Sequence, residues 1–141
     1  MKARGADAVF DYHDPSCAAQ IKAYANNSLR YILDTISTSS SYAICADAFP
    51  NENESTEKLS LVSLHPLDGW PRKDVGAKPI LAYTTFGEAF SKNRMDFPTI
   101  KEHYDFGVGF WKLNERLVAE GKIVPHPVTL GKGGLGGVPA G

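Results

Sequence analysis

The sequence lacks the features that would indicate a disulfide-linked, membrane-bound or nucleic-acid-binding protein. Only two of its 141 residues are cysteines, Cys17 and Cys45. Both fall in segments predicted to be helical, so we interpret them as reduced core residues of a cytoplasmic protein. No apolar run is long enough to span a bilayer, and no basic-then-apolar leader indicates secretion. The formal net charge is −1 with both signs mixed along the chain, which argues against a nucleic-acid partner.

Motifs that identify common catalytic and metal sites are also missing. The sequence has no nucleophile elbow, no CxxC, no HExxH and no GxxxxGK[ST] motif. The histidines show no metal-ligand spacing, and we predict no metal site from them; they are His13, His65, His103 and His126. The glycine-rich stretch Gly131–Gly137 lacks the preceding strand and following helix of a phosphate-binding loop, so we do not interpret it as one.

The chain is organised around an apolar stretch, Leu29–Ile36, which lies between two polar turn sequences. Its β-branched and aromatic residues are typical of a buried strand, predicted over Leu29–Leu33. An upstream strand is predicted at Ala6–Phe10, with burial on both faces, and a helix at Pro15–Tyr24 with Asp14 as its N-cap. Strand, helix and strand within about thirty residues match the size of a parallel crossover unit.

The later segments continue this α/β pattern. We expect a helix over Ser37–Phe49 and a strand at Leu59–Leu64, followed by a surface excursion over His65–Val75 and a second strand at Pro79–Phe86. An irregular or partly helical segment is expected at Ala89–Asp96. The last two predicted elements are a helix at Thr99–Glu120 and an extended segment at Ile123–Val128.

The helix at Thr99–Glu120 has the clearest boundaries. Thr99 and Glu102 form a predicted capping box, and Gly121 is expected to end the helix. Two glycines inside it, Gly107 and Gly109, could allow a bend.

In open parallel sheets, ligands bind outside the carboxyl ends of the strands. Candidate residues at these ends are therefore Tyr12, Asp34, the pair Ser63 and Leu64, and the segment Thr84–Glu88. Each has an alternative structural role. Tyr12 fits a surface turn, Asp34 a loop anchor, Ser63 and Leu64 an ordinary strand end, and Gly87 a simple turn.

Three segments together resemble the medium-chain dehydrogenase/reductase superfamily, and within it the fungal trans-acting enoyl reductases and their ToxD-like, zinc-independent relatives. These segments are Lys2–Tyr12, which reads K-x-R-G-A-D-x-V-F-D-Y, Leu29–Ser37 and Thr85–Glu88. The resemblance implies an α/β fold with a partial, doubly wound, Rossmann-type parallel sheet. It implies that residues 1–121 form a partial cofactor domain without its first strand and glycine-rich loop, and that residues 122–141 are a truncated return into the catalytic domain with a largely disordered tail.

The resemblance also implies a reaction and a set of binding residues. Members of the family use NADPH to reduce an activated carbon–carbon double bond of an acyl or enone substrate, and the fungal members partner polyketide synthases. Tyr12 matches a position at the adenosine phosphate end of the cofactor, and the backbone near Ser63 and Leu64 lies on the nicotinamide side. The substrate pocket is expected to be lined by Ile80, Leu81, Ala82, Tyr83, Thr84, Thr85, Phe86 and Gly87. No residue is identified as the catalytic acid.

A second interpretation stays open. In a Rossmann fold the pyrophosphate is held mainly by a glycine-rich turn and a helix N-terminus, and this sequence contains no such turn. The alternative to a fragment of an NADPH-dependent enoyl reductase is therefore a truncated, inactive α/β protein, or an interaction module that binds no cofactor.

Overall fold

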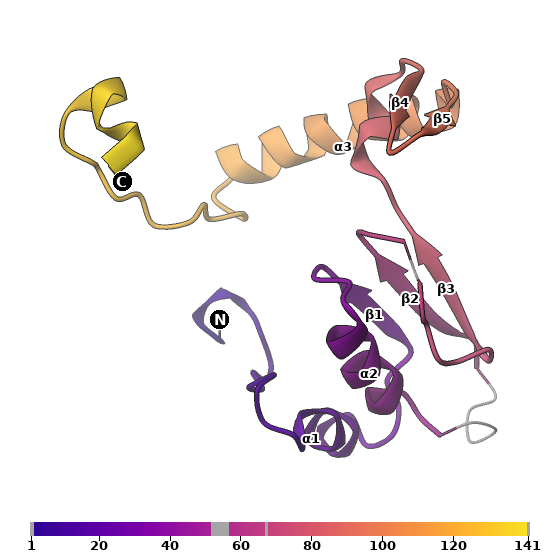
Figure 1. Cartoon of the computed structure of the whole chain (residues 1–141). Coiled ribbons are helices and arrows are strands. Elements are labelled where there is room, and N and C mark those ends of the chain that lie inside the picture. Colours follow the sequence, from indigo (N-terminus) through magenta and orange to yellow (C-terminus); the bar gives the residue numbers. More distant parts are fainter. Residues whose placement is uncertain (1, 52–56, 67, 141) are drawn as a thin grey trace. The chain divides into compact units, whose positions relative to one another are not determined.

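The computed structural model describes residues 2–51, 57–66 and 68–140, and it divides into two compact units, residues 1–82 and 83–141 (Figure 1). The first unit contains η1 (Lys2–Arg4), α1 (Cys17–Tyr24), β1 (Tyr31–Asp34), α2 (Ser39–Ala48), β2 (Leu59–Ser63) and β3 (Val75–Pro79). The predicted division at residue 121 stays a prediction.

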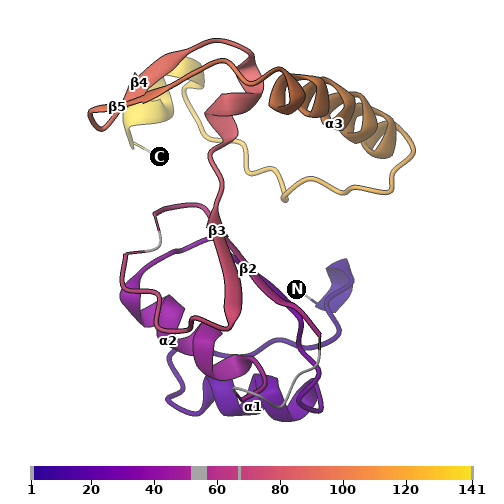
Figure 2. The ribbon, with the colours of Figure 1, turned by 90° about the vertical axis from the view of Figure 1, so that its right-hand side faces the viewer.

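The first unit contains a three-stranded parallel sheet in the order β1-β2-β3, with α1 and α2 on one side of it (Figure 1). Figure 2 shows β3 beside β2. Ile32 of β1 lies beside Leu61 of β2, which lies beside Ala77 of β3. Because residues paired in this way point to the same face, they form one apolar surface. The predicted α/β fold with a parallel sheet is confirmed, including the parallel pairing of the strands around Leu33 and Val62.

The core lies where α2 packs against this surface. Its fully or nearly fully buried side chains are Phe49, Leu59, Leu61 and Val75. Leu59 and Leu61 alternate along β2 with half-buried residues, which is the pattern of a strand with one better-covered face. α1 in turn packs against α2.

The expected strand at Ala6–Phe10 is wrong. These residues are irregular, and none of the described strands pairs with them. A strand requires a neighbour for its backbone groups; here Phe10 instead packs edge-on against Tyr24 of α1, with ring centroids 5.7 Å apart. β1 also differs from the prediction of a buried strand, because Tyr31 is 77% exposed and Leu33 is exposed too.

The ends of the two helices follow local side-chain chemistry. α1 begins at Cys17 with Ser16 as its N-cap, so the N-cap assigned to Asp14 is wrong. Asp14 instead accepts hydrogen bonds from the Ser16 N–H and from Gln20. At α2 the predicted serine- and threonine-rich cap is confirmed, because Thr38 accepts from the Ser41 N–H and Ser41 Oγ accepts from the Thr38 N–H.

The segment predicted as a surface excursion, His65–Val75, is partly anchored. Arg72 donates to the carbonyl oxygens of Ala46 and Pro50 at the end of α2, at 3.1 and 2.7 Å. It also pairs with Asp74, which holds the pKa of that carboxyl below its usual value. This part of the chain therefore closes the C-terminal end of α2.

The second unit contains η2 (Ala82–Phe86), β4 (Phe90–Lys92), β5 (Met95–Phe97), α3 (Lys101–Ala119) and η3 (Gly134–Ala140). The strand predicted at Pro79–Phe86 is wrong: β3 ends at Pro79, and η2 follows. The irregular segment predicted at Ala89–Asp96 is also wrong, because β4 and β5 form an antiparallel hairpin. Asn93 and Arg94 both have positive φ, the geometry of a two-residue hairpin turn.

α3 runs without interruption through both glycines. The predicted capping box is wrong, since the N-cap is Ile100 and no side chain caps the first turn. The predicted end is confirmed: Gly121 has φ +68° and its N–H donates to the carbonyl of Val118. No helix within the described residues combines the length and apolar character needed to cross a membrane.

Candidate functional site

The carboxyl ends of the three parallel strands form the first candidate site. Asp34, Ser63 and Pro79 occupy the same register position at the ends of β1, β2 and β3. The residues that follow these strands therefore emerge at one edge of the sheet, which is the edge where parallel sheets bind ligands.

Asp34 holds the loop between β1 and α2. Its Oδ1 accepts hydrogen bonds from the N–H groups of Ile36 and Ser37, both at 2.9 Å. Its Oδ2 accepts from Ser41 Oγ at 2.6 Å. The carboxylate is buried but has polar partners on both oxygens. The interpretation of Asp34 as a loop anchor is therefore confirmed.

The two residues assigned to the nicotinamide side differ in accessibility. Ser63 is 0% exposed, its Oγ donates to the His65 carbonyl, and its own carbonyl accepts from the Ile80 N–H. Leu64 is 41% exposed, and its N–H donates to Ser37 Oγ at 3.1 Å and to the Asp34 carbonyl at 3.3 Å. A ligand at this edge can thus touch the Leu64 side chain, whereas the Ser63 hydroxyl is enclosed.

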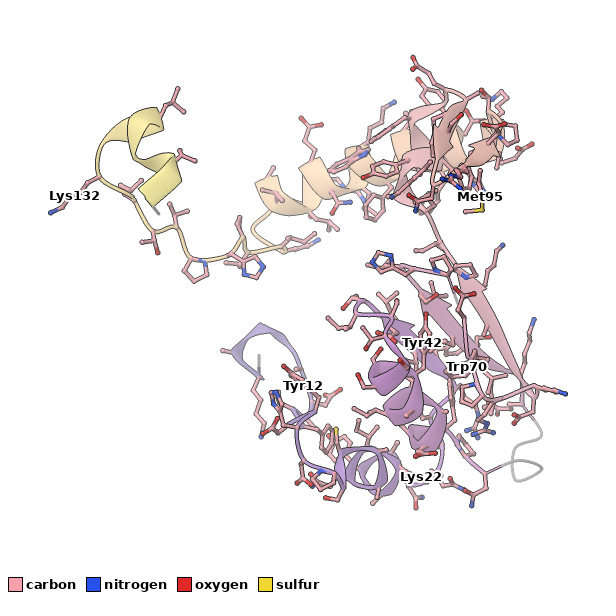
Figure 3. All side chains as sticks on the ribbon, in the orientation of Figure 1. Tyr12, Lys22, Tyr42, Trp70, Met95 and Lys132 are labelled. Carbon is pink, nitrogen blue, oxygen red and sulfur yellow. The ribbon has the colours of Figure 1, made fainter. Side chains whose placement is uncertain are left out.

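Tyr12 lies on the turn before α1, where Figure 3 labels it. Its ring is exposed and packs on the ring of His13, with centroids 3.9 Å apart. Asp11 accepts from the His13 N–H, which lowers the pKa of its carboxyl. At the sheet edge the Ile80 N–H donates to the Ser63 carbonyl, and the Leu64 N–H donates to Ser37 and Asp34. Tyr12 is not among the residues that these bonds connect.

The predicted substrate segment is divided between two local environments. Ile80 follows β3 and is exposed at the sheet edge, and Leu81 follows it. Residues 82–86 form η2, and Gly87 has positive φ in the turn that follows. The prediction of one continuous strand through these residues thus gives way to a strand end followed by a short helix.

The second unit contains a small aromatic pocket with a volume of about 230 Å³. Its lining residues are Tyr83, Phe86, Glu88, Ala89 and Phe90. Tyr83 and Phe86 belong to the predicted substrate segment, whereas Ala89 and Phe90 were missed. Both lie in the segment predicted as irregular, and recognition of the hairpin turn would have revealed Phe90.

η2 is hydrogen-bonded to α3 and packs closely against it. Thr84 Oγ1 and His103 Nδ1 are 2.9 Å apart and share a hydrogen bond. A Cβ placed on Gly107 would lie 2.9 Å from Thr85 Cβ, and one on Gly87 would lie 2.7 Å from the Tyr104 ring. Both glycines therefore permit contacts that no other residue would allow without a shift.

The described residues contain neither a cluster of potential metal ligands nor a disulfide-bonded cysteine. No group of three or more histidine, cysteine or acidic side chains among them could hold a metal ion. Cys17 in α1 and Cys45 in α2 are free. Burial, and secondarily the nearby Asp34, raises the pKa of the Cys45 thiol to about 12. Burial also raises the pKa of Cys17.

Comparisons with known proteins give a consistent set of relatives. The chain is 47% identical over 138 residues to the dual trans-enoyl reductase/FAD-dependent monooxygenase tazHJ of Aspergillus terreus. The matched region covers 97% of this chain and 19% of that protein. It is 38% identical over 141 residues to the trans-enoyl reductase ACTTS2 of Alternaria alternata, covering 100% of this chain and 39% of that protein. For the trans-enoyl reductase RAP2 of Pyricularia oryzae the identity is 30%, with 98% and 38% covered.

The chain thus spans between about one fifth and two fifths of the length of these relatives. No protein-family model matches the sequence.

Proposed function

We propose that this chain forms part of the cofactor-binding sheet of an NADPH-dependent, zinc-independent enoyl reductase of the medium-chain type. The proposal rests on the similarity of the chain to the fungal trans-enoyl reductases, which confirms the predicted resemblance to them. In the proposed reaction, NADPH gives a hydride to the β-carbon of an activated double bond, and a proton adds to the α-carbon. The products are NADP⁺ and the saturated acyl compound. No residue of this chain is assigned as the proton donor.

The observation that supports this proposal is the parallel sheet with its strand ends at one edge. Such an edge is where nucleotides bind in open α/β sheets. Exposed Leu64 and Ile80 would contact the nicotinamide side, and the exposed Tyr12 ring would lie at the adenosine phosphate end. The edge would therefore contact the nicotinamide side of the cofactor, and the turn that carries Tyr12 would contact its adenosine phosphate end.

The diphosphate is the part of NADPH that these residues do not hold. The sequence has no glycine-rich turn between a strand and a helix, which is the usual pyrophosphate site. We propose that the pyrophosphate-binding site is formed by sequence that the longer relatives carry beyond the matched region. Binding of NADPH by the 141 residues alone is accordingly expected to be weak.

The substrate proposal rests on η2 and the residues next to it. Tyr83 and Phe86 line the aromatic pocket with Phe90, and this apolar surface suits the acyl chain of an enoyl or enone substrate. Glu88 is the acidic residue among the five that line it. A polyketide synthase is the proposed partner that presents the acyl chain.

A chimera tests the proposed function. In it, this chain replaces the matched residues of the Alternaria relative, a match that includes 100% of this chain and 39% of that protein. We expect the chimera to oxidise NADPH in the presence of an α,β-unsaturated acyl thioester, measured by the loss of NADPH absorbance and by mass spectrometry of the product. The unmodified Alternaria protein is the positive control.

Two variants sharpen the experiment. Tyr12→Ala is expected to raise the KM for NADPH without a change in the KM for the thioester, whereas Tyr24→Ala, an exposed tyrosine of α1, is the matched control. A chimera that folds, as judged by circular dichroism, but does not oxidise NADPH would contradict the proposal and favour the inactive α/β protein.

A further inference from the structure

Ser37 has an unusual backbone conformation directly after β1. Its φ is +58°, in the left-handed region that residues other than glycine and asparagine rarely adopt. A strained residue of this kind persists where its surroundings fix it, and such residues are concentrated at functional sites. The contacts of Ser37 therefore indicate what its conformation achieves.

Three hydrogen bonds fix Ser37 between the ends of two strands. Its N–H donates to Asp34 Oδ1 at 2.9 Å, and its Oγ donates to the Asp34 carbonyl at 3.0 Å. The same Oγ accepts from the Leu64 N–H at 3.1 Å. The Ser37 hydroxyl thus donates its proton to β1 and accepts a hydrogen bond from the residue that follows β2. The second bond connects residues 27 positions apart in the sequence.

This hydroxyl is a specific link and not a general feature of the turn. Ser39 and Ser40 lie in the same serine-rich stretch and are exposed, and Ser40 pairs with Thr38 within the turn itself. Asp34 holds the loop, and its contact with Leu64 is made by its backbone carbonyl, which accepts from the Leu64 N–H at 3.3 Å. Ser37 therefore supplies the side-chain contact between the β1–α2 loop and Leu64.

We propose that Ser37 is a positioning residue for the cofactor: its hydroxyl holds the backbone of Leu64, so that the exposed Leu64 side chain keeps one position against the nicotinamide side of NADPH. This inference rests on the proposed function. Ser37 does not touch the cofactor itself, and its effect passes through the Leu64 N–H.

Two substitutions separate the hydroxyl from the backbone strain. Ser37→Ala removes the hydroxyl and leaves a side chain in the left-handed region, so it should lower both the thermal midpoint and cofactor affinity. Ser37→Gly also removes the hydroxyl but relieves the strain, since glycine adopts positive φ readily. The glycine variant should therefore keep a thermal midpoint close to that of the unmodified chain. Ser39→Ala is the matched control for loss of a serine hydroxyl.

The kinetic test uses these variants in the active chimera. We expect both Ser37 variants to raise the KM for NADPH by about fivefold, the change that corresponds to one hydrogen bond. The kcat and the KM for the acyl thioester should stay the same, and Ser39→Ala should behave as the unmodified chimera. A fall in kcat together with a rise in both KM values would show a merely structural role and overturn the proposal.

Amide hydrogen exchange on the full 141-residue chain tests the contact itself. Exchange at Leu64 should be faster in Ser37→Gly, and unchanged in Ser39→Ala. Unchanged Leu64 exchange, or an unchanged KM for NADPH in an active chimera, would overturn the positioning role and leave the proposed function standing. An unmodified chimera that folds without oxidising NADPH would overturn the proposed function and this role with it.

Discussion

The two compact units differ sharply in how they use their apolar side chains. In the first, Phe49 and Leu61 are both 0% exposed between α2 and the sheet. In the second, Gly107 is the one buried residue among those whose burial the structure describes, and α3 exposes aromatic side chains along its length, including Phe106 and Trp111. An apolar helix pattern therefore produces a core only where a second apolar surface of the same unit faces it.

The largest expected effect comes from a matched pair of phenylalanine truncations. Phe49→Ala should lower the free energy of unfolding by about 3–5 kcal/mol, because it leaves a cavity in the core. Phe106→Ala, at a ring that is 66% exposed, should change it by less than about 0.5 kcal/mol. Urea unfolding followed by circular dichroism measures both. Equal losses would show that α3 is buried as deeply as α2 in solution.

A pair of arginine truncations compares buried and exposed charge. Arg72→Ala should cost about 1.5–3 kcal/mol, because the carbonyls of Ala46 and Pro50 lose a charged donor. Arg116→Ala in α3 removes an exposed ion pair with Glu120, 3.9 Å long, and should cost about 0.5 kcal/mol or less. Thermal unfolding of the two variants provides the comparison, and similar shifts in midpoint would disprove the role of Arg72 at the end of α2.

Two glycines of α3 should respond with opposite signs. Gly107→Ala places a Cβ 2.9 Å from Thr85 Cβ, and this overpacking should cost about 1–3 kcal/mol. Gly109→Ala meets nothing within 4 Å and should stabilise the helix by up to about 1 kcal/mol. The thermal midpoint of each variant decides the sign. A stable Gly107→Ala variant would show that η2 does not approach α3 closely.

At neutral pH the smallest expected effect is that of the Cys45 thiol, which gives the first unit a pH dependence in the alkaline range. The pKa of Cys45 is raised from 9.0 to about 12 in the folded chain. The folded state therefore keeps the thiol protonated, while the unfolded chain releases that proton at lower pH. The free energy of unfolding should consequently fall as pH rises from about 9 to 12. Cys45→Ala should show a shallower decline over that range, and identical slopes would contradict the shift.

The sequence was informative where hydrophobic pattern and spacing decide the structure. β1, β2 and the helix between them follow from two short apolar runs separated by a capped helical segment. The crossover spacing was applied to a strand at Ala6–Phe10 that the structure lacks, and the parallel pairing is found between β1 and β2. The pattern failed for β3, whose residues Val75–Pro79 include glycine, lysine and proline. Only Val75 of β3 is buried, so the strand depends on backbone pairing with β2 and not on an apolar signal of its own.

Other elements were missed because tertiary or turn geometry decides them. The hairpin turn at Asn93 and Arg94 contains no glycine, although both residues adopt positive φ. Aromatic residues at 83 and 86 favour a strand by propensity, yet they lie in η2 and line the pocket with Phe90. A local preference for extended backbone is thus overridden by side-chain packing.

The candidate site was predictable only in part, for the same reasons. Ser63 and Leu64 could be placed at the sheet edge because strand ends of a parallel sheet coincide. Ile80 was assigned only through the family resemblance, since the strand expected over Pro79–Phe86 placed it away from that edge, and the structure brings it there by ending β3 at Pro79. The enclosure of Ser63 Oγ by the His65 carbonyl depends on the turn after β2. The hydrogen bond from Leu64 to Ser37 depends on strand register and on a positive φ at serine. Neither has a signature in the sequence.

Within the described residues, β1 and β3 are the edge strands of the sheet, and the two edges differ in character. An incoming strand at β3 would meet the charge of Lys78 and, at Pro79, a residue without an N–H. At β1 it would meet the uncovered side chains of Tyr31 and Leu33. If this chain forms fibrils in concentrated solution, growth should accordingly be one-sided and proceed by strand addition at β1.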